Sequence, residues 1–244
     1  MDERILYFDI VNGISGDMTI ASLLDLGISE EIFIEEINKL SVSDEFKIEI
    51  NKKNENGIVG TNIKVISNET ESHRHLVDIF EIIDKSSLDD SIKNTAKKIF
   101  MTIGKAEAKV HGTTIDKIHF HEVGAIDSIV DIVGTAILID LLNIDKICAT
   151  IVPVGSGFIK CDHGLIPVPA PATIEILKNV PVKFNTVNGE CTTPTGAAII
   201  KTLCDEFVDV LELEVNQIGY GIGEKSFEVP NLLRTILGIK KNKK

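Results

Sequence analysis

The chain has 244 residues and a formal net charge of −12, from 25 basic and 37 acidic side chains. This length allows one large domain or two small ones, with a core that needs no disulfide to hold it. The acidic excess argues against general nucleic-acid binding, which requires clustered Lys and Arg. With no Trp and only two Tyr, a surface for stacking single-stranded bases is also excluded, so we expect no nucleic-acid partner.

The chain carries no signal for secretion or for insertion into a membrane. Its first residues, MDERILYFDI, lack the basic start and long apolar run of a signal peptide. The most apolar segment, 126–142, contains three aspartates and is too polar to span a bilayer. The four cysteines are widely spaced without a CxxC pair, which is typical of reduced thiols. We therefore expect a cytoplasmic protein with no membrane partner.

In the first half of the chain, strand and helix patterns follow one another. Residues 4–10 are typical of a buried strand, and helices are predicted at about 18–26 and directly after Ser29. Alternating polar and apolar residues at 47–51 and 62–66 predict a hairpin with its turn within 52–57. Helical periodicity runs from 75 to 110 in two pieces broken near Ser86, before a short strand at 118–121 and a helix at 126–142.

The second half has a different pattern. We predict a strand at 146–154, a Gly- and Pro-rich loop at 155–172, a helix at 173–178, a strand near 182–185, a helix capped by Thr193, and strands at 207–216 and 232–239. There is no internal repeat. The irregular order of strands and helices favours an α+β (mixed α/β) fold, with helices packed on a mixed sheet, over a doubly wound one.

Two His-x-His motifs are candidate metal ligands: His73 with His75, and His119 with His121. On a strand, residues i and i+2 share a face, so His119 and His121 would point the same way, next to Glu122. Imidazoles with a carboxylate suit Ni²⁺, Zn²⁺ or Fe²⁺. Either motif alone is equally typical of surface histidines. Together they are a better candidate, because a mononuclear site needs three or four ligands.

Two aspartates follow the second motif on one helix face, Asp127 and Asp131 at i and i+4. Such carboxylates can orient ligating imidazoles through hydrogen bonds. The alternative is a solvated acidic stripe, and for Asp131 this is the interpretation that we prefer.

The turn after the first strand contains Gly13, Ser15, Gly16 and Asp17. Backbone N–H groups at a helix N-terminus can bind an anion such as a phosphate, although this turn matches neither a Walker A nor a dinucleotide fingerprint. An aspartate would repel a phosphate, so Asp17 better fits a metal-bridged or capping role. An ordinary tight turn is the alternative.

The loop at 155–172 holds Cys161 and His163 two residues apart. A rigid loop of this composition can form the wall or lid of a site, and the two side chains could ligate a metal. Both residues are equally compatible with a structural role.

Taken in order, these stretches resemble the LarC family of nickel insertion proteins, which act in the biosynthesis of the nickel-pincer cofactor. The resemblance rests on six stretches: FD with GISGDM (8–18), HRHL (73–76), HFHEVGAIDSIVDIVG (119–134), HGLIPVPAPAT (163–173), TPTGAAI (193–199) and GYGIG (219–223). It covers about residues 5–240.

The resemblance implies a cyclometallase, classed among the lyases. Such an enzyme inserts nickel into pyridinium-3,5-bisthiocarboxylic acid mononucleotide, forming Ni–S and Ni–C bonds and consuming CTP, and its product serves lactate racemase. It also implies that residues 1–240 form a single amino-terminal domain and that residues 241–244 are a basic tail or the stump of a linker. CTP and a divalent cation, Mg²⁺ or Mn²⁺, would be bound through a carboxy-terminal domain, which becomes an expected partner. A homo-oligomer is also compatible with the resemblance.

On this basis we assign roles to the candidate residues. His119 and His121, with His73 and His75, would hold nickel, and Glu122 or Asp127 would take the proton that metallation releases. The mononucleotide would contact Gly13, Ser15, Gly16, Asp17 and His163, with its phosphate at the turn. Two other functions stay open, a non-catalytic nickel-binding or assembly module and a metal-dependent hydrolase.

Overall fold

The computed structural model describes residues 2–67, 74–120, 123–161 and 164–241, and the backbone alone at His119. Its helices are α1 (Gly16–Leu24), α2 (Glu30–Ile37), α3 (Leu76–Lys85), α4 (Asp90–Val110), α5 (Ile126–Leu142), α6 (Pro171–Ile176) and α7 (Pro194–Leu203), with short 3₁₀ turns at Ser43–Glu45 and Ile115–Lys117. The strands are β1 (Glu3–Asp9), β2 (Phe46–Glu55), β3 (Ile58–Ser67), β4 (Arg74–His75), β5 (His119–Phe120), β6 (Lys146–Ala149), β7 (Val152–Pro153), β8 (Phe158–Cys161), β9 (Gly164–Pro167), β10 (Val182–Lys183), β11 (Glu206–Phe207), β12 (Glu214–Ile222) and β13 (Leu232–Lys240).

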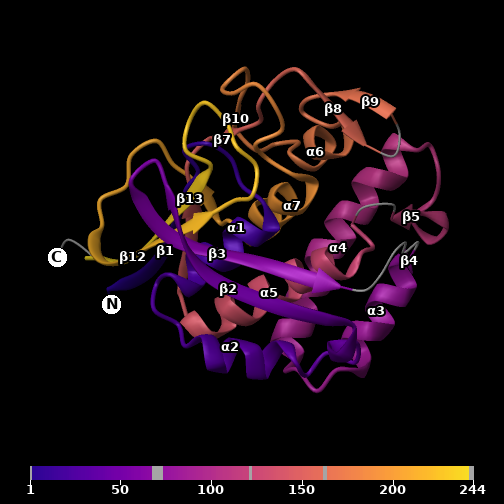
Figure 1. Ribbon diagram of the computed structural model, residues 1–244, viewed down its shortest axis with the longest axis horizontal. Coiled ribbons are helices and arrows are strands. Elements are labelled where there is room, and N and C mark those ends of the chain that lie inside the picture. Colours follow the sequence, from indigo (N-terminus) through magenta and orange to yellow (C-terminus); the bar gives the residue numbers. More distant parts are fainter. Residues whose placement is uncertain (1, 68–73, 121–122, 162–163, 242–244) are drawn as a thin grey trace.

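A mixed sheet of seven strands organises the described part of the chain, in the order β11-β6-β1-β13-β12-β3-β2. Strand β1 is parallel to β6 and antiparallel to β13, which in turn is antiparallel to β12. Helices α1 and α5 pack on the sheet, and α4 packs on α5 and contacts α6 and α7. In Figure 1 the strands β1, β12 and β13 lie near the two termini, and α3 and α4 lie at the opposite side of the molecule. The expected class, helices on a mixed sheet, is confirmed.

Most predicted elements of the first half are confirmed. The hairpin forms, but its strands extend to a two-residue turn at Asn56 and Gly57, both with positive φ, which is the geometry that an Asn-Gly hairpin turn requires. Ser29 caps α2 by accepting a hydrogen bond from the amide of Ile32 at 3.3 Å. The helical region after residue 75 divides into α3 and α4, as the break near Ser86 predicts.

Three expectations for the second half are wrong in detail. The strand predicted at 146–154 is two strands, since β6 pairs with β1 whereas β7 pairs with β10 in a separate sheet. The loop predicted at 155–172 contains the β8–β9 hairpin and the start of α6. The strand predicted at 207–216 covers β11 and the start of β12, and residues 208–213 between them belong to neither, although the Val208 amide still donates to the Ala149 carbonyl of β6 at 2.8 Å. Alternation of residues cannot reveal which neighbours are available for pairing.

Helix α1 lies unusually close to the sheet, against two glycines of β12. A Cβ at Gly219 would be 2.1 Å from the carbonyl oxygen of Ser22, and a Cβ at Gly221 would be 2.0 Å from that of Met18. Residues i and i+2 lie on the same face of a strand, so the Gly-x-Gly pattern leaves that face of β12 without side chains at both positions. The backbone of α1 can therefore pack directly on the strand. The Thr235 hydroxyl on β13 donates to that of Ser22 at 2.7 Å, which adds a buried polar contact to the same interface.

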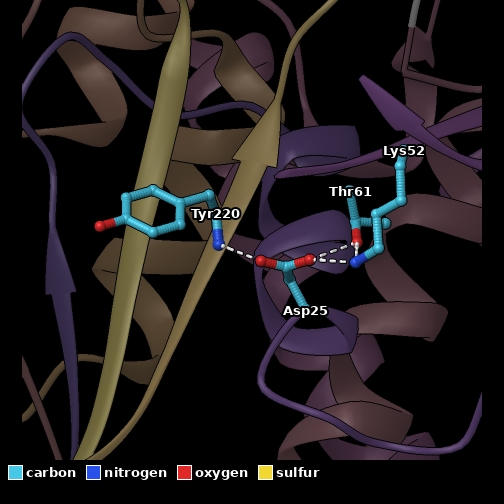
Figure 2. A network of polar contacts seen from close by, with 4 residues as sticks. All are labelled: Asp25, Lys52, Thr61 and Tyr220. Atoms are coloured by element: carbon cyan, nitrogen blue, oxygen red, sulfur yellow. Dashed lines mark hydrogen bonds and ion pairs between the residues drawn. The ribbon is translucent and has the colours of Figure 1, made fainter. Parts of the chain in front are cut away.

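The carboxyl end of α1 is held by Asp25, whose side chain joins three strands (Figure 2). Its carboxylate accepts hydrogen bonds from the Lys52 ammonium, from the Thr61 hydroxyl at 2.7 Å and from the Tyr220 amide at 2.9 Å. Burial by itself raises the pKa of Asp25, but these hydrogen bonds outweigh it, so the pKa lies below its ordinary value. Both ends of α1 are thus tied to the sheet by contacts remote in sequence.

None of the described helices is both long enough and apolar enough to cross a membrane.

The close contact between α1 and β12 predicts a large penalty for adding one methyl group. Gly221→Ala should lower the free energy of unfolding by about 3 kcal/mol, because the Met18 carbonyl leaves no room for a Cβ. Gly104→Ala is the matched control, since a Cβ there meets only ordinary contacts at 3.4 Å and beyond. Because Gly104 lies in the middle of α4, Gly104→Ala should raise the free energy of unfolding slightly, by less than about 1 kcal/mol. Urea unfolding of both variants measures the difference, and equal stabilities would contradict the packing argument.

Candidate functional site

The turn between β1 and α1 lies where three segments of the chain meet. The backbone carbonyl of Ile14 accepts a hydrogen bond from the Thr193 amide at 3.1 Å, and the Asn12 side chain donates to the Pro230 carbonyl at 2.9 Å. Gly13 has a φ of +115°, and a Cβ there would be 2.0 Å from the Cys191 carbonyl oxygen. The predicted turn, the segment before α7 and the loop after β12 therefore form one closely packed unit.

Helix α5 brings a carboxylate to the first residue of α1. A Cβ on Gly16 would lie 2.4 Å from Oδ2 of Asp131, so only glycine fits beside this side chain. Asp131 is partly buried, and no hydrogen bond or ion pair reaches its carboxylate from the residues that the structure describes. The solvated role that we preferred for Asp131 is therefore wrong, because at this position α5 packs against Gly16 of α1, whereas Asp127 one turn earlier on the same face is exposed.

The pKa of Asp131 lies well above its ordinary value. Burial is the main cause, followed by the negative charges of Asp17 and Asp127. The N-terminus of α1, beside Asp131, normally stabilises a carboxylate and lowers its pKa. Because the pKa of Asp131 is raised instead, the removal of its carboxylate from water outweighs the contribution of the helix. A carboxyl group with a raised pKa is suited to accepting a proton near neutral pH.

Asp17 belongs to the same acidic cluster. Its carboxylate accepts a hydrogen bond from the Ser15 hydroxyl. Burial nevertheless raises its pKa, and Glu224 in the loop after β12 adds to the shift, whereas the Ser15 hydrogen bond opposes it. Carboxylates from α1, α5 and this loop thus act on one another in a small volume, an arrangement that favours bound protons or cations over anions.

A pocket of about 130 Å³ opens beside the turn. Its lining residues are Ser15, Asp17, Met18, Glu190, Cys191, Thr193, Gly223, Glu224, Lys225, Phe227 and Asn231. Lys225 forms an ion pair with Glu190 at 3.0 Å, and the buried side-chain oxygen of Asn231 accepts no hydrogen bond from the described residues. Burial raises the pKa of the Cys191 thiol, which favours its protonated form. The pocket thus combines acidic groups with an unpaired acceptor.

The described parts of the two histidine motifs lie on neighbouring strands. Strands β4 and β5 pair in antiparallel register, with Arg74 opposite Phe120 and His75 opposite His119. Nδ1 of His75 lies 2.9 Å from the Ile118 carbonyl oxygen. Since a carbonyl can only accept, Nδ1 donates, and the lone pair of the neutral ring is then on Nε2. Metal-ligating histidines are commonly oriented by such a hydrogen bond.

Helix α5 connects the two parts of the candidate site. It begins six residues after β5, with Asp127 exposed in its first turn and Asp131 one turn further on against Gly16. Asp127 accepts a hydrogen bond from the amide of Ser128 at 2.7 Å. Helix α5 therefore starts close in sequence to β5 and contacts the acidic turn near its amino end.

The structure brings together Gly13, Ser15, Gly16 and Asp17 in the turn, and His75 and His119 through their backbones. His73, His121, Glu122 and His163 lie outside the described residues, as does the side chain of His119. Within the described ranges, no group of three or more His, Cys, Asp and Glu side chains is placed to hold a metal ion. The metal assignments therefore stay predictions.

Sequence reasoning missed several groups at the turn: Glu190, Cys191, Glu224 and Asn231. Two of them lie next to recognised motifs, since Cys191 is two residues before TPTG and Glu224 follows GYGIG directly. The available signal was therefore proximity to those motifs, but nothing in the sequence shows that the two segments meet.

Comparison with known proteins gives consistent results. Residues 6–244 match the family model described as nickel insertion protein. The chain is 49% identical over 247 residues to the pyridinium-3,5-bisthiocarboxylic acid mononucleotide nickel insertion protein of Clostridium kluyveri, covering 96% of this chain and 62% of that protein. It is also 49% identical over 251 residues to the protein of the same name from Acetivibrio thermocellus, covering 98% of this chain and 61% of the relative. The chain thus spans about three fifths of the length of these relatives. No solved structure matches it.

The raised pKa of Asp131 predicts a stability that decreases as pH rises. Below the unfolded pKa of about 3.9 the carboxyl group is protonated in both states and costs nothing. As pH rises toward the folded pKa, the unfolded state releases the proton first, so the native state loses stability. Asp131→Asn should therefore raise the free energy of unfolding at pH 7 by about 1 kcal/mol and flatten its decline above pH 4.

Asp127→Asn is the control for this prediction, since Asp127 lies exposed on the same face of α5. Its loss should change stability less than the loss of Asp131 does, because the favourable charge in the first turn of the helix is removed while the repulsion between Asp127 and Asp131 is relieved. Thermal unfolding between pH 4 and pH 8 distinguishes the two. A lower stability of Asp131→Asn at pH 7 would contradict the unpaired, desolvated state of this carboxylate.

Proposed function

The chain belongs to the nickel insertion protein family, and we propose that it holds nickel and a pyridinium mononucleotide together while nickel is inserted into the pyridinium ring. The observation that carries this proposal is the β4–β5 pairing, which sets His75 opposite His119. Strand β5 is followed by α5, the helix whose Asp131 contacts Gly16 of the turn. The relatives are named for nickel insertion into pyridinium-3,5-bisthiocarboxylic acid mononucleotide, and this is the substrate that we propose.

In this proposal nickel is cargo that is bound and then released. Imidazoles are good ligands for Ni²⁺, and the two thiocarboxylates of the substrate supply sulfur donors of their own. A protein site that transfers the ion needs ligands strong enough to collect it and weak enough to give it up. His73, His75, His119 and His121 are the proposed ligands, and the backbone register of His75 with His119 supports this set.

Formation of a bond between nickel and a ring carbon displaces the proton of that carbon, so a base is required. Glu122 and Asp127 are the proposed acceptors, and Asp131 joins them because its pKa is raised. The acidic cluster also suits the substrate ring, since a pyridinium carries a positive charge. Negative groups close to it would hold the ring in place through their electrostatic field.

The other contacts of the mononucleotide are proposed at the turn, at Gly13, Ser15, Gly16 and Asp17, and at His163. The backbone amides at the start of α1 support a phosphate there, whereas the carboxylates of Asp17 and Asp131 oppose it. A cation between phosphate and carboxylate would reconcile the two. CTP and Mg²⁺ or Mn²⁺ are proposed to act through a carboxy-terminal domain. The complete lyase activity is proposed to require that domain as well.

Nickel binding tests the first part of this proposal. In equilibrium dialysis the chain should bind nickel, and the double variant His75→Asn with His119→Asn should bind it at least about tenfold more weakly. Asparagine is chosen because it can still cap α3, where His75 is the N-cap residue. His111→Asn, at the end of α4, is the control and should bind nickel as the original chain does.

Turnover tests the second part. The chain is mixed with nickel, the mononucleotide, CTP and Mg²⁺, with and without the carboxy-terminal domain of a relative, and the nickel-carbon product is followed by mass spectrometry. Product that forms only when both parts are present supports the proposal. Nickel binding without product under either condition indicates an assembly module, and hydrolysis of simple esters with added zinc would indicate a hydrolase.

A further inference from the structure

A second cavity, larger than the pocket beside the turn, lies between α4, α6 and α7. Its volume is about 910 Å³, within the range of small-molecule sites. Its described lining residues are Phe80, Asn94, Lys97, Lys98, Met101, Thr102, Lys105, Ala106, Glu175, Ile176, Lys178, Asn179, Lys201 and Thr202. None of them belongs to the candidate site. Helix α7 starts at the acidic turn and ends at this cleft, about 15 Å away along its axis.

The charge of the cleft is opposite to that of the chain. Five lysines line it with a single carboxylate, Glu175, in a chain of net charge −12. Ammonium groups gathered around one concave surface repel one another and concentrate anions from solution. From this we propose that the cleft binds a nucleoside phosphate, with the phosphates on the α4 lysines and the base on its apolar wall.

Contacts within the protein hold some of these lysines at the edges of the cleft. Lys97 forms an ion pair with Asp84 and lies 5.5 Å from the centre of the Phe80 ring, a cation–π distance. Lys178 bonds Glu175 at 2.8 Å, and Lys201 donates to the backbone carbonyl of Lys178 at 2.6 Å. These contacts therefore hold the three ammonium groups at the edge of the cleft.

Lys98 and Lys105 differ from the other three lysines, since their ammonium groups form neither an ion pair nor a hydrogen bond with a described residue, whereas Lys97 and Lys178 pair with carboxylates and Lys201 bonds a carbonyl. Both are exposed, and they are seven residues apart on one face of α4, about 10 Å along the helix. Flexible lysine stems from two such positions can converge on one chain of phosphates.

Neutral groups in the cleft fit the remainder of a nucleotide. The hydroxyl groups of Thr102 on α4 and Thr202 on α7 are 3.1 Å apart, so the two helices present adjacent hydrogen-bonding groups. Phe80, Met101 and Ile176 provide an apolar wall on which a heterocyclic base can pack. Cations beside an apolar wall recognise a nucleoside phosphate better than an inorganic anion, which would use only the cations.

Calorimetric titration in a chloride buffer without divalent metal tests this proposal, with three probes: ATP, nicotinic acid mononucleotide and inorganic tripolyphosphate. We expect both nucleotides to bind, ATP more tightly because it carries more charge, and tripolyphosphate more weakly than ATP. Lys98→Gln with Lys105→Gln should weaken ATP binding at least about tenfold. Lys64→Gln with Lys160→Gln removes the same charge at exposed positions elsewhere and should change it less than about twofold.

The outcomes separate the cleft from the nickel site. Nickel dialysis of the Lys98 and Lys105 variant should match that of the original chain, so failure at the cleft is distinguishable from failure of the proposed function. If ATP does not bind, or if both double variants weaken it equally, the cleft is not a nucleotide site. Tripolyphosphate binding as tight as that of ATP would overturn the role of the apolar wall. Tighter binding of the mononucleotide than of ATP would assign the cleft to a mononucleotide ligand.

Discussion

The contact between the backbone of α1 and two glycines of β12 is the constraint on which the rest of this structure depends. With its Met18 and Ser22 carbonyls against Gly221 and Gly219, the helix has almost no freedom to shift or rotate. Its first residue, Gly16, is then fixed beside Asp131, and its last turn is fixed by the hydrogen bonds of Asp25. The position of the acidic turn therefore follows from packing in the sheet, through a helix that is held at both ends.

Charge is distributed unevenly over the described part of the molecule, and the distribution separates two kinds of chemistry. Carboxylates gather at the start of α1, where burial and mutual repulsion raise the pKa values of Asp17 and Asp131. Lysines gather at the far end of α7, around the large cleft. An unpaired, partly buried carboxylate beside a motif glycine costs stability, and this cost is the reason for proposing that Asp131 acts in binding or proton transfer. A cation and an anion can thus be bound on one chain without competing for the same side chains.

Local sequence signals predicted much of the fold. Periodicity identified the long helices, the Asn-Gly turn lies within the predicted hairpin turn, and Ser29 and Thr193 cap helices as expected. The errors fall where pairing partners decide the outcome: β6 and β7 belong to different sheets, and residues 208–213, which look like a strand, belong to no strand of the described sheets. For the candidate site, the sequence points to the turn and to the two histidine motifs, whose roles stay predictions, whereas the solvated role expected for Asp131 is wrong, because an acid at i+4 on a helix is as typical of a solvated face.

By itself, then, the sequence determined the class of fold, the family through its ordered motifs, and the residue types able to bind nickel. These properties depend on local spacing, which a linear chain displays directly. Only the tertiary structure decided that His75 lies opposite His119, that Gly16 faces Asp131, and that five lysines surround one cleft. Each of these depends on segments far apart in the chain, and burial of apolar faces brings those segments together without leaving a local trace in the sequence.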